Sequence, residues 1–257
     1  MTNCRVPSDW SADFSGCLYD WQTLVGGGLA LLAALLGALF LYFQIDQTAA
    51  LNRADLVRRH NASRSVMPLG LAAISEFCAS IVDQIAQAIE LQDNPDFDLA
   101  LQGHVDDYYK RMHFNPVKIS DDVIAVIKEF IETLTDTSNV RHVAELLSKI
   151  QILQARFNGF NLHQIAAVES LYGLLLDSAT VGLLNDRMFN YSRFVDDASF
   201  SLVGVVPTRE AWDLVHKKAN GLIFSRNIPD LFFSPLAEKI ERYKKDDVSP
   251  WNEKFAV

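Results

Sequence analysis

The chain has 257 residues, of which 49% are hydrophobic, and a formal net charge of −9. Five acidic and five basic side chains balance each other in residues 1–65, so the whole net charge belongs to residues 66–257. An acidic domain is a poor candidate for binding nucleic acid, because phosphates attract Lys and Arg. A chain of this length is long enough for one domain with a real core.

The N-terminal part contains a long uncharged stretch, residues 21–45, bounded by Asp20 and Asp46. A bilayer core is about 30 Å thick, and about 20 apolar residues span it as a helix. A signal peptide would begin with basic residues and carry a shorter apolar run, whereas this stretch follows an acidic tail. We therefore predict a retained single-pass transmembrane helix that contacts the lipid bilayer.

Basic residues follow this stretch closely, at Arg53, Arg58, Arg59 and Arg64, while only Arg5 precedes it. Lys and Arg collect on the cytoplasmic side of membrane helices. We expect the N-terminus outside the cell membrane and the C-terminal domain in the cytoplasm. The four arginines are predicted to set this topology and to face lipid phosphates.

The predicted span has small residues along one face, Gly26, Ala30, Ala33 and Gly37. Small residues let membrane helices approach closely. We expect a homodimer contact here, the alternative being that Gly and Ala are simply common in such helices.

Two of the three cysteines, Cys4 and Cys17, lie in the predicted external tail. An oxidising compartment would allow a disulfide between them, and two free thiols are the alternative. Cys78 lies on an apolar helix face and is expected to be a buried small hydrophobe.

Beyond the span, apolar residues recur at every third or fourth position, which predicts helices. The first of these continues from the membrane and ends or kinks at Pro68, which has no N–H donor. The others are predicted over residues 69–91, 121–134, 140–157, 162–194, 208–220 and 229–243. Gly221 is the expected stop of the helix over 208–220. The strand-like run at 200–206 is expected to be a buried loop.

The pattern predicts an all-α protein, with an N-terminal transmembrane helix extended into the cytosol and followed by an antiparallel helical bundle. No βαβ alternation or phosphate-binding glycine motif is present. The predicted parts are an external tail (1–20), the span (21–45), a juxtamembrane helix (46–67), a helical cytoplasmic domain (68–246) and a loose tail (247–257).

The sequence contains no recognisable catalytic, cofactor or metal motif. His104, Asp106, Asp107 and His113 fall close together, but their spacing matches no common zinc pattern, and solvated loop residues are the simpler interpretation. We therefore predict no catalytic residue, metal or cofactor. A site assembled from distant residues would leave no trace in one sequence.

The chain resembles a group of uncharacterised bacterial single-pass membrane proteins. The resemblance is carried by Asp20-Trp21-Gln22-Thr23-Leu24-Val25-Gly26, with Arg58-Arg59, Ala62-Ser63-Arg64 and Met67-Pro68-Leu69. The shared features of these proteins are an N-terminal "DWQTL" span and a helical cytoplasmic part. The resemblance covers roughly residues 19–75. It implies a bacterial inner-membrane location and brings no activity with it.

Three functions are compatible with these observations. The leading hypothesis is a membrane-tethered helical protein that binds an unidentified protein partner, or itself, at the cytoplasmic face. The first alternative is a membrane-anchored enzyme with a site made of scattered residues. The second is a small membrane sensor whose external tail, with Cys4 and Cys17, reports on the outside.

Overall fold

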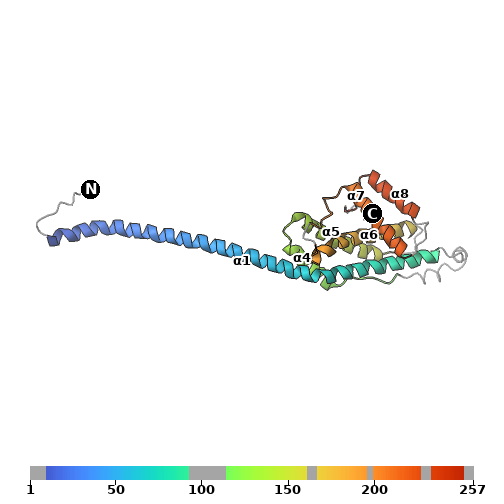
Figure 1. Ribbon diagram of the computed structural model, residues 1–257, viewed down its shortest axis with the longest axis horizontal. Coiled ribbons are helices and arrows are strands. Elements are labelled where there is room, and N and C mark those ends of the chain that lie inside the picture. Colours follow the sequence, from blue (N-terminus) through green and yellow to red (C-terminus); the bar gives the residue numbers. More distant parts are fainter. Residues whose placement is uncertain (1–9, 93–113, 161–166, 196–198, 227–232, 252–257) are drawn as a thin grey trace. The chain divides into compact units, whose positions relative to one another are not determined.

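The computed structural model describes residues 10–92, 114–160, 167–195, 199–226 and 233–251. Within these ranges the chain forms six α-helices and no strand (Figure 1), which confirms the predicted all-α class. The helices are α1 (Trp10–Gln92), α4 (Asp121–Thr133), α5 (Thr137–Asn158), α6 (Ala167–Ser192), α7 (Thr208–Ser225) and α8 (Phe233–Lys245). The chain divides into two compact units, Met1–Val57 and Arg58–Val257.

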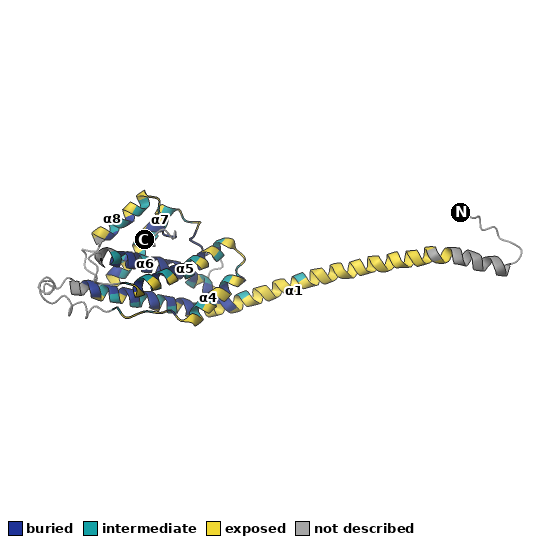
Figure 2. Cartoon of the chain, turned by 180° about the vertical axis from the view of Figure 1, so that it is seen from behind, coloured by how far each residue is buried: buried dark blue, intermediate teal, exposed yellow. Residues whose placement is uncertain are grey.

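The described part of the first unit is the N-terminal portion of α1, and its apolar side chains are unburied. Leu24 is 69% exposed and Phe40 is 73% exposed, and the yellow colour of Figure 2 continues along this part of the helix. It is the one described helix that is long and apolar enough to cross a membrane. Water would oppose the exposure of so many large apolar side chains.

We expected the helix to end or kink at Pro68; α1 does not end there but continues as one helix of 83 residues. Pro68 cannot donate a hydrogen bond to the carbonyl of Arg64, which costs about 3 kcal/mol. The neighbouring side chains of Met67 and Leu71 are fully buried, and each contributes about 1.5–3 kcal/mol by leaving water. The burial of these side chains in the core thus outweighs the local cost of Pro68 in the helix. The second unit, which starts at Arg58, begins within this same helix.

The second unit is a bundle in which α6 is the central helix. Every residue of α6 between Leu171 and Asn185 is buried except Asp177, which is half-buried. α6 packs against α5 and α7, while α4 packs on α5 and α8 on α7. The C-terminal part of α1 contributes a row of fully buried side chains to the same core, namely Met67, Leu71, Ile74, Ile81, Ile85 and Ile89.

Side-chain caps explain where α4 and α5 begin. Ser120 accepts a hydrogen bond from the backbone N–H of Asp122, and Asp136 accepts one from Ser138. Such caps satisfy N–H groups that have no partner within the helix. They place the start of α4 as predicted and start α5 somewhat earlier than expected.

Two glycines inside α6 make room for cationic side chains instead of breaking the helix. A Cβ on Gly173 would lie 3.0 Å from Nη2 of Arg156, and one on Gly182 would lie 3.0 Å from Cε of Lys218. Arg156 pairs with Asp177 and Lys218 pairs with Asp186, in each case one turn beyond the glycine. The long side chains therefore cross α6 at the glycines to reach these carboxylates.

α7 runs past Gly221, so the predicted stop at that residue is wrong. Ile223 in the following turn is fully buried, and burying it stabilises the fold by more than the roughly 1 kcal/mol that a helical glycine costs. The run at 200–206 is a loop, and its Phe200, Leu202 and Val203 are buried, as expected.

Candidate functional site

His60 on α1 is the middle member of a hydrogen-bonded chain that joins α6 to α4. The Thr133 hydroxyl donates to the carbonyl of Phe130 over 2.8 Å, so its oxygen accepts from Nδ1 of His60 over 3.0 Å. Nδ1 therefore carries the proton of the neutral ring. Nε2 of His60 is left to accept the hydroxyl of Tyr191 over 2.9 Å. The chain thus runs in one direction, from α6 through α1 to α4.

Arg64, one turn further along α1, is held between two aromatic rings. Its Cζ lies 3.9 Å from the ring centre of Tyr191 and 4.1 Å from that of Phe194. Its Nε donates to the carbonyl of Tyr191 over 2.6 Å. Only 5% of the residue is exposed. Cation–π contacts of this kind are strongest where water is excluded.

The same guanidinium lies at the C-terminal end of α6, where a positive charge is favourable. The N–H of Phe194 donates to the Tyr191 carbonyl and the N–H of Val195 to that of Asn190, each over 3.0 Å. This pair of bonds is a Schellman motif, in which the residue with positive φ is usually glycine. Here it is Phe194, with φ of 60°. We call His60, Arg64, Thr133, Tyr191 and Phe194 the α1 junction.

Burial lowers the pKa of His60 below its ordinary 6.5, and the charge of Arg64 lowers it further. The neutral ring is therefore the form that fits the hydrogen-bonded chain. His142 is a second buried imidazole, whose Nδ1 accepts the N–H of Leu202 over 3.1 Å and whose Nε2 donates to the carbonyl of Leu184 over 3.0 Å. Burial lowers the pKa of His142 to about 4.

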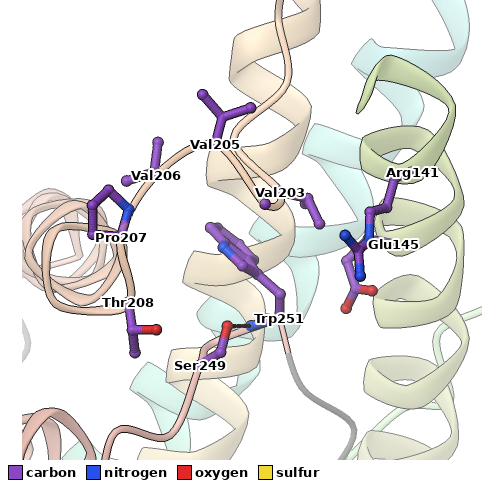
Figure 3. A pocket seen from close by; sticks show the side chains of 10 residues that line it. Arg141, Glu145, Val203, Val205, Val206, Pro207, Thr208, Ser249 and Trp251 are labelled. Atoms are coloured by element: carbon purple, nitrogen blue, oxygen red, sulfur yellow. Dashed lines mark hydrogen bonds between the residues drawn. The ribbon is translucent and has the colours of Figure 1, made fainter. Parts of the chain in front are cut away.

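A pocket of about 760 Å³ lies elsewhere in the bundle (Figure 3). We call it the Arg141 pocket. Its lining residues are Arg141, Glu145, Val203, Gly204, Val205, Val206, Pro207, Thr208, Ser249 and Trp251. In Figure 3 the indole of Trp251 stands between the start of α7 on one side and Arg141 with Glu145 on the other.

The walls of the Arg141 pocket are fixed by local contacts. Gly204 has φ of 76°, and a Cβ there would lie 3.2 Å from Nη1 of Arg141, so the guanidinium lies against the loop backbone. Nε1 of Trp212 donates to the carbonyl of Val248, and the N–H of Trp251 donates to Ser249. Trp251 is only 8% exposed. Residues 248–251 are therefore packed, contrary to the loose tail expected from 247.

Arg64 corrects one of the sequence predictions about the basic residues. Its side chain is buried in the α1 junction, so the expectation that it faces lipid is wrong. Arg53, Arg58 and Arg59 are exposed, and their part in topology stays a prediction.

The predictions for the small residues of the span and for the tail cysteines remain untested, whereas the prediction for Cys78 is confirmed. Gly26, Ala30, Ala33 and Gly37 are exposed, and their self-association stays a prediction. Cys4 lies outside the described residues, as does the side chain of Cys17. Cys78 is buried and its pKa is raised to about 12 by that burial, as expected of an unreactive thiol.

The described residues contain no group of three or more His, Cys, Asp or Glu that could hold a metal ion. His104, Asp106, Asp107 and His113 lie outside those residues, so the prediction made for them is untested. The α1 junction supplies hydrogen bonds and charge to hold helices together. Its geometry serves packing and positioning of α1, whereas the Arg141 pocket is a hollow among the described residues with room for a small molecule.

Sequence reasoning missed His60, Tyr191 and Trp251. One signal could have found the first. The core-facing residues of α1 alternate at steps of four and three, and this register extends back to His60 and Arg64 through His60, Arg64, Met67, Leu71, Ile74, Cys78, Ile81 and Ile85. Polar residues in an apolar register indicate a buried polar contact. Tyr191 follows Val181, Leu184 and Met188 at the same spacing, which predicts an inward-facing position, whereas no comparable pattern marks Trp251.

Comparison with known proteins gives no relative for this chain. No family model matches it, and neither a curated protein nor a solved structure matches it. The proposals below therefore depend on the sequence and the geometry alone.

Proposed function

We propose that this protein is a membrane-tethered helical protein whose bundle works at the cytoplasmic face by contacting another protein or a second copy of itself. The observation that carries the proposal is α1. One uninterrupted helix contains the exposed apolar stretch from residue 24 to 45 and, further along, the buried row from Met67 to Ile89.

The anchor and the bundle therefore share a helix and have no flexible linker between them. Linkers rich in Gly and Ser would let a domain move freely relative to its anchor. The segment 46–59 contains no Gly or Pro and is helical throughout. The α1 junction begins directly after it.

Topology is tested by labelling with a membrane-impermeant maleimide. Cys4 and Cys17 are natural reporters for the N-terminal tail. Ala125, exposed on α4, is a site for a reporter in the bundle, as Ala125→Cys in a chain with Cys4→Ser and Cys17→Ser. We expect the tail to be labelled in intact cells and Ala125→Cys only after lysis. The reverse pattern would overturn the proposed orientation.

Interaction is tested by cross-linking in native membranes, followed by purification of the full chain. The variant inserts Gly-Ser-Gly-Ser after Ala50, and its matched control inserts four alanines, which keep the helix. We expect cross-linked dimers or a defined partner with the native chain, and a loss of these that is greater with the flexible insertion. A native chain that is only monomeric and captures no partner contradicts the proposal.

A further inference from the structure

We propose that the site now holding residues 114–119, which we call the strap, also binds an extended segment of a partner protein. This inference rests on the proposed function and names the kind of partner, a chain that presents an aromatic and an aliphatic side chain three residues apart. The strap forms neither helix nor strand and leads directly into Ser120, the N-cap of α4. Pro116 favours an extended shape, because the residue before a proline avoids the helical conformation.

Two side-chain amides hold the strap by its backbone. Gln84 of α1 accepts the N–H of Asn115 over 2.6 Å and donates to its carbonyl over 3.2 Å. Asn158 of α5 makes the same pair of bonds to Val117, over 3.1 Å and 3.2 Å. In an antiparallel sheet, one residue of the neighbouring strand exchanges both bonds with its opposite residue in this way. Each amide therefore takes the place of a residue in a neighbouring strand.

A third amide continues the same pattern. Gln154 of α5 accepts the N–H of Ile119 over 3.1 Å. The bonded residues of the strap are thus every second one, as along one edge of an extended chain. The N–H of Lys118, between two bonded residues, makes no hydrogen bond with another described residue. The three amides contact backbone groups, which every sequence has, so another extended chain can make the same bonds.

Two side chains of the strap define which partner fits. The ring centre of Phe114 lies 5.0 Å from that of Phe157 and 5.4 Å from that of Phe160. Val117 packs against the core and, like Phe114, is half-buried. A partner segment therefore needs an aromatic residue and, three positions further on, an aliphatic one. Main-chain bonds would give the affinity, and these two side chains the specificity.

The strap can open at low cost to make room for the partner. The four bonds to Asn115 and Val117 are exposed to solvent, and so are the residues Asn115, Pro116 and Lys118. Within the strap, Ile119 alone is buried. Segments with exposed hydrogen bonds and few buried apolar contacts open more easily than the core does. Ile119 can therefore stay in the core while the rest of the strap opens and the partner takes over its bonds.

The test uses the purified full-length protein in detergent and the peptide acetyl-Phe-Asn-Pro-Val-Lys-amide, which repeats residues 114–118 and carries 4-fluorophenylalanine at its first position. Fluorine NMR of the peptide measures binding. The double variant Phe114→Gly with Val117→Gly removes the two side chains that anchor the strap. We expect the peptide to bind this variant with a Kd of about 1 mM or tighter. It should bind the native chain about tenfold more weakly, because the native strap competes at a high effective concentration.

Two methylated peptides separate backbone recognition from apolar adhesion. A methyl group on the nitrogen of the valine removes the donor that Asn158 accepts from Val117, and should weaken binding about tenfold. A methyl group on the nitrogen of the lysine alters the position of Lys118, whose N–H has no described partner, and should leave binding unchanged. Both peptides gain the same methyl group and the same kind of tertiary amide.

Protein variants test the site from the other side. Added to the double variant, Asn158→Ala should weaken peptide binding about tenfold, because two hydrogen bonds are lost. Gln151→Ala, at an exposed position of α5, should leave it unchanged. Circular dichroism checks that each variant is folded, and Phe114→Gly alone replaces the double variant if that variant unfolds.

The proposal is overturned if the peptide does not bind the variant with the weakened strap. It is also overturned if the two methylated peptides bind alike, or if Asn158→Ala and Gln151→Ala behave alike. These measurements need neither a membrane nor a captured partner. A failure here therefore leaves the cross-linking test of the proposed function standing, and a failure of that test leaves peptide binding to be measured on its own.

Discussion

His60 and Arg64 lie one turn apart on α1, and both bind the same residue of α6, Tyr191. The imidazole accepts the Tyr191 hydroxyl over 2.9 Å, and the Arg64 Nε donates to the Tyr191 carbonyl over 2.6 Å. One tyrosine is therefore held at its side chain and its backbone by one face of α1. This double contact fixes both the position and the rotation of α1 where it enters the core.

Replacing Arg64 should destabilise the bundle. Arg64→Ala removes the bond to Tyr191, the two ring contacts and the positive charge at the end of α6, and we expect a loss of about 3 kcal/mol. Arg64→Lys should lose nearly as much, since an ammonium cannot stack as a planar guanidinium does. The measurement is urea-induced unfolding of the full chain in detergent. Arg58→Ala, at an exposed position on the same helix, should stay within about 0.5 kcal/mol of wild type. An equal effect of the two alanine variants would contradict the assigned role.

The effect of Phe194→Gly on the stability of the bundle should depend on whether position 64 holds Arg or Ala. Glycine would relieve the cost of the left-handed backbone at φ 60°, about 1 kcal/mol. It would also remove the ring that stacks on Arg64. We expect Phe194→Gly to be neutral or destabilising in the native chain and stabilising by about 1 kcal/mol in Arg64→Ala. A double-mutant cycle measures this coupling, and strictly additive effects would contradict it.

The helices beyond the span were predictable because their apolar residues recur at helical spacing. Their ends were less so. Pro68 and Gly221 are local signals for stopping a helix, yet Leu71 and Ile223 are buried just beyond them. The energy of that burial comes from residues distant in sequence. A single sequence gives the local cost of such residues and does not give the packing that offsets it.

The candidate sites were predictable only in part. His60 and Arg64 continue the core register of α1, so their burial could be inferred from spacing. Their partners Thr133 and Tyr191 are far along the chain, and only the fold brings them together. Trp251 lies in a polar C-terminal segment, and nothing near it in the sequence indicates that it lines a pocket.

Acid should destabilise the bundle through His142. Its pKa is about 4 in the folded protein, against 6.5 when unfolded, so the unfolded state binds more protons between these values. The stability that depends on neutral His142 is complete above pH 6.5 and is lost as the pH falls toward 4, by about 3 kcal/mol in total. Urea unfolding from pH 7.5 to 4.5 measures it. His142→Gln should be less stable at pH 7.5 but show a weaker dependence on pH, and an unchanged dependence would contradict the assignment.

His60 should titrate below pH 6.5 in the folded protein, first because it is buried and second because Arg64 is close. Its stabilising contribution is present above pH 6.5 and declines as the pH falls through the folded pKa. An NMR titration of its ring protons measures this directly. Arg64→Gln should raise the pKa without restoring it fully, since burial remains. Arg242→Gln, at an exposed position on α8, should leave it unchanged. A His60 ring that titrates at or above 6.5 would rule out this account of the α1 junction.

Three glycines should respond differently to the same substitution. Gly221→Ala adds a methyl group with nothing within 4 Å, so the better helix propensity of alanine should stabilise the bundle by about 0.5–1 kcal/mol. Gly173→Ala and Gly182→Ala gain the same propensity but press on Arg156 and Lys218 at 3.0 Å. These side chains must then shift away from Asp177 and Asp186, and we expect both variants to be about 1 kcal/mol less stable than Gly221→Ala. Adding Arg156→Ala to Gly173→Ala should recover the propensity gain relative to Arg156→Ala alone. If all three single variants stabilise equally in urea unfolding, the glycines are not there to let the cations cross α6.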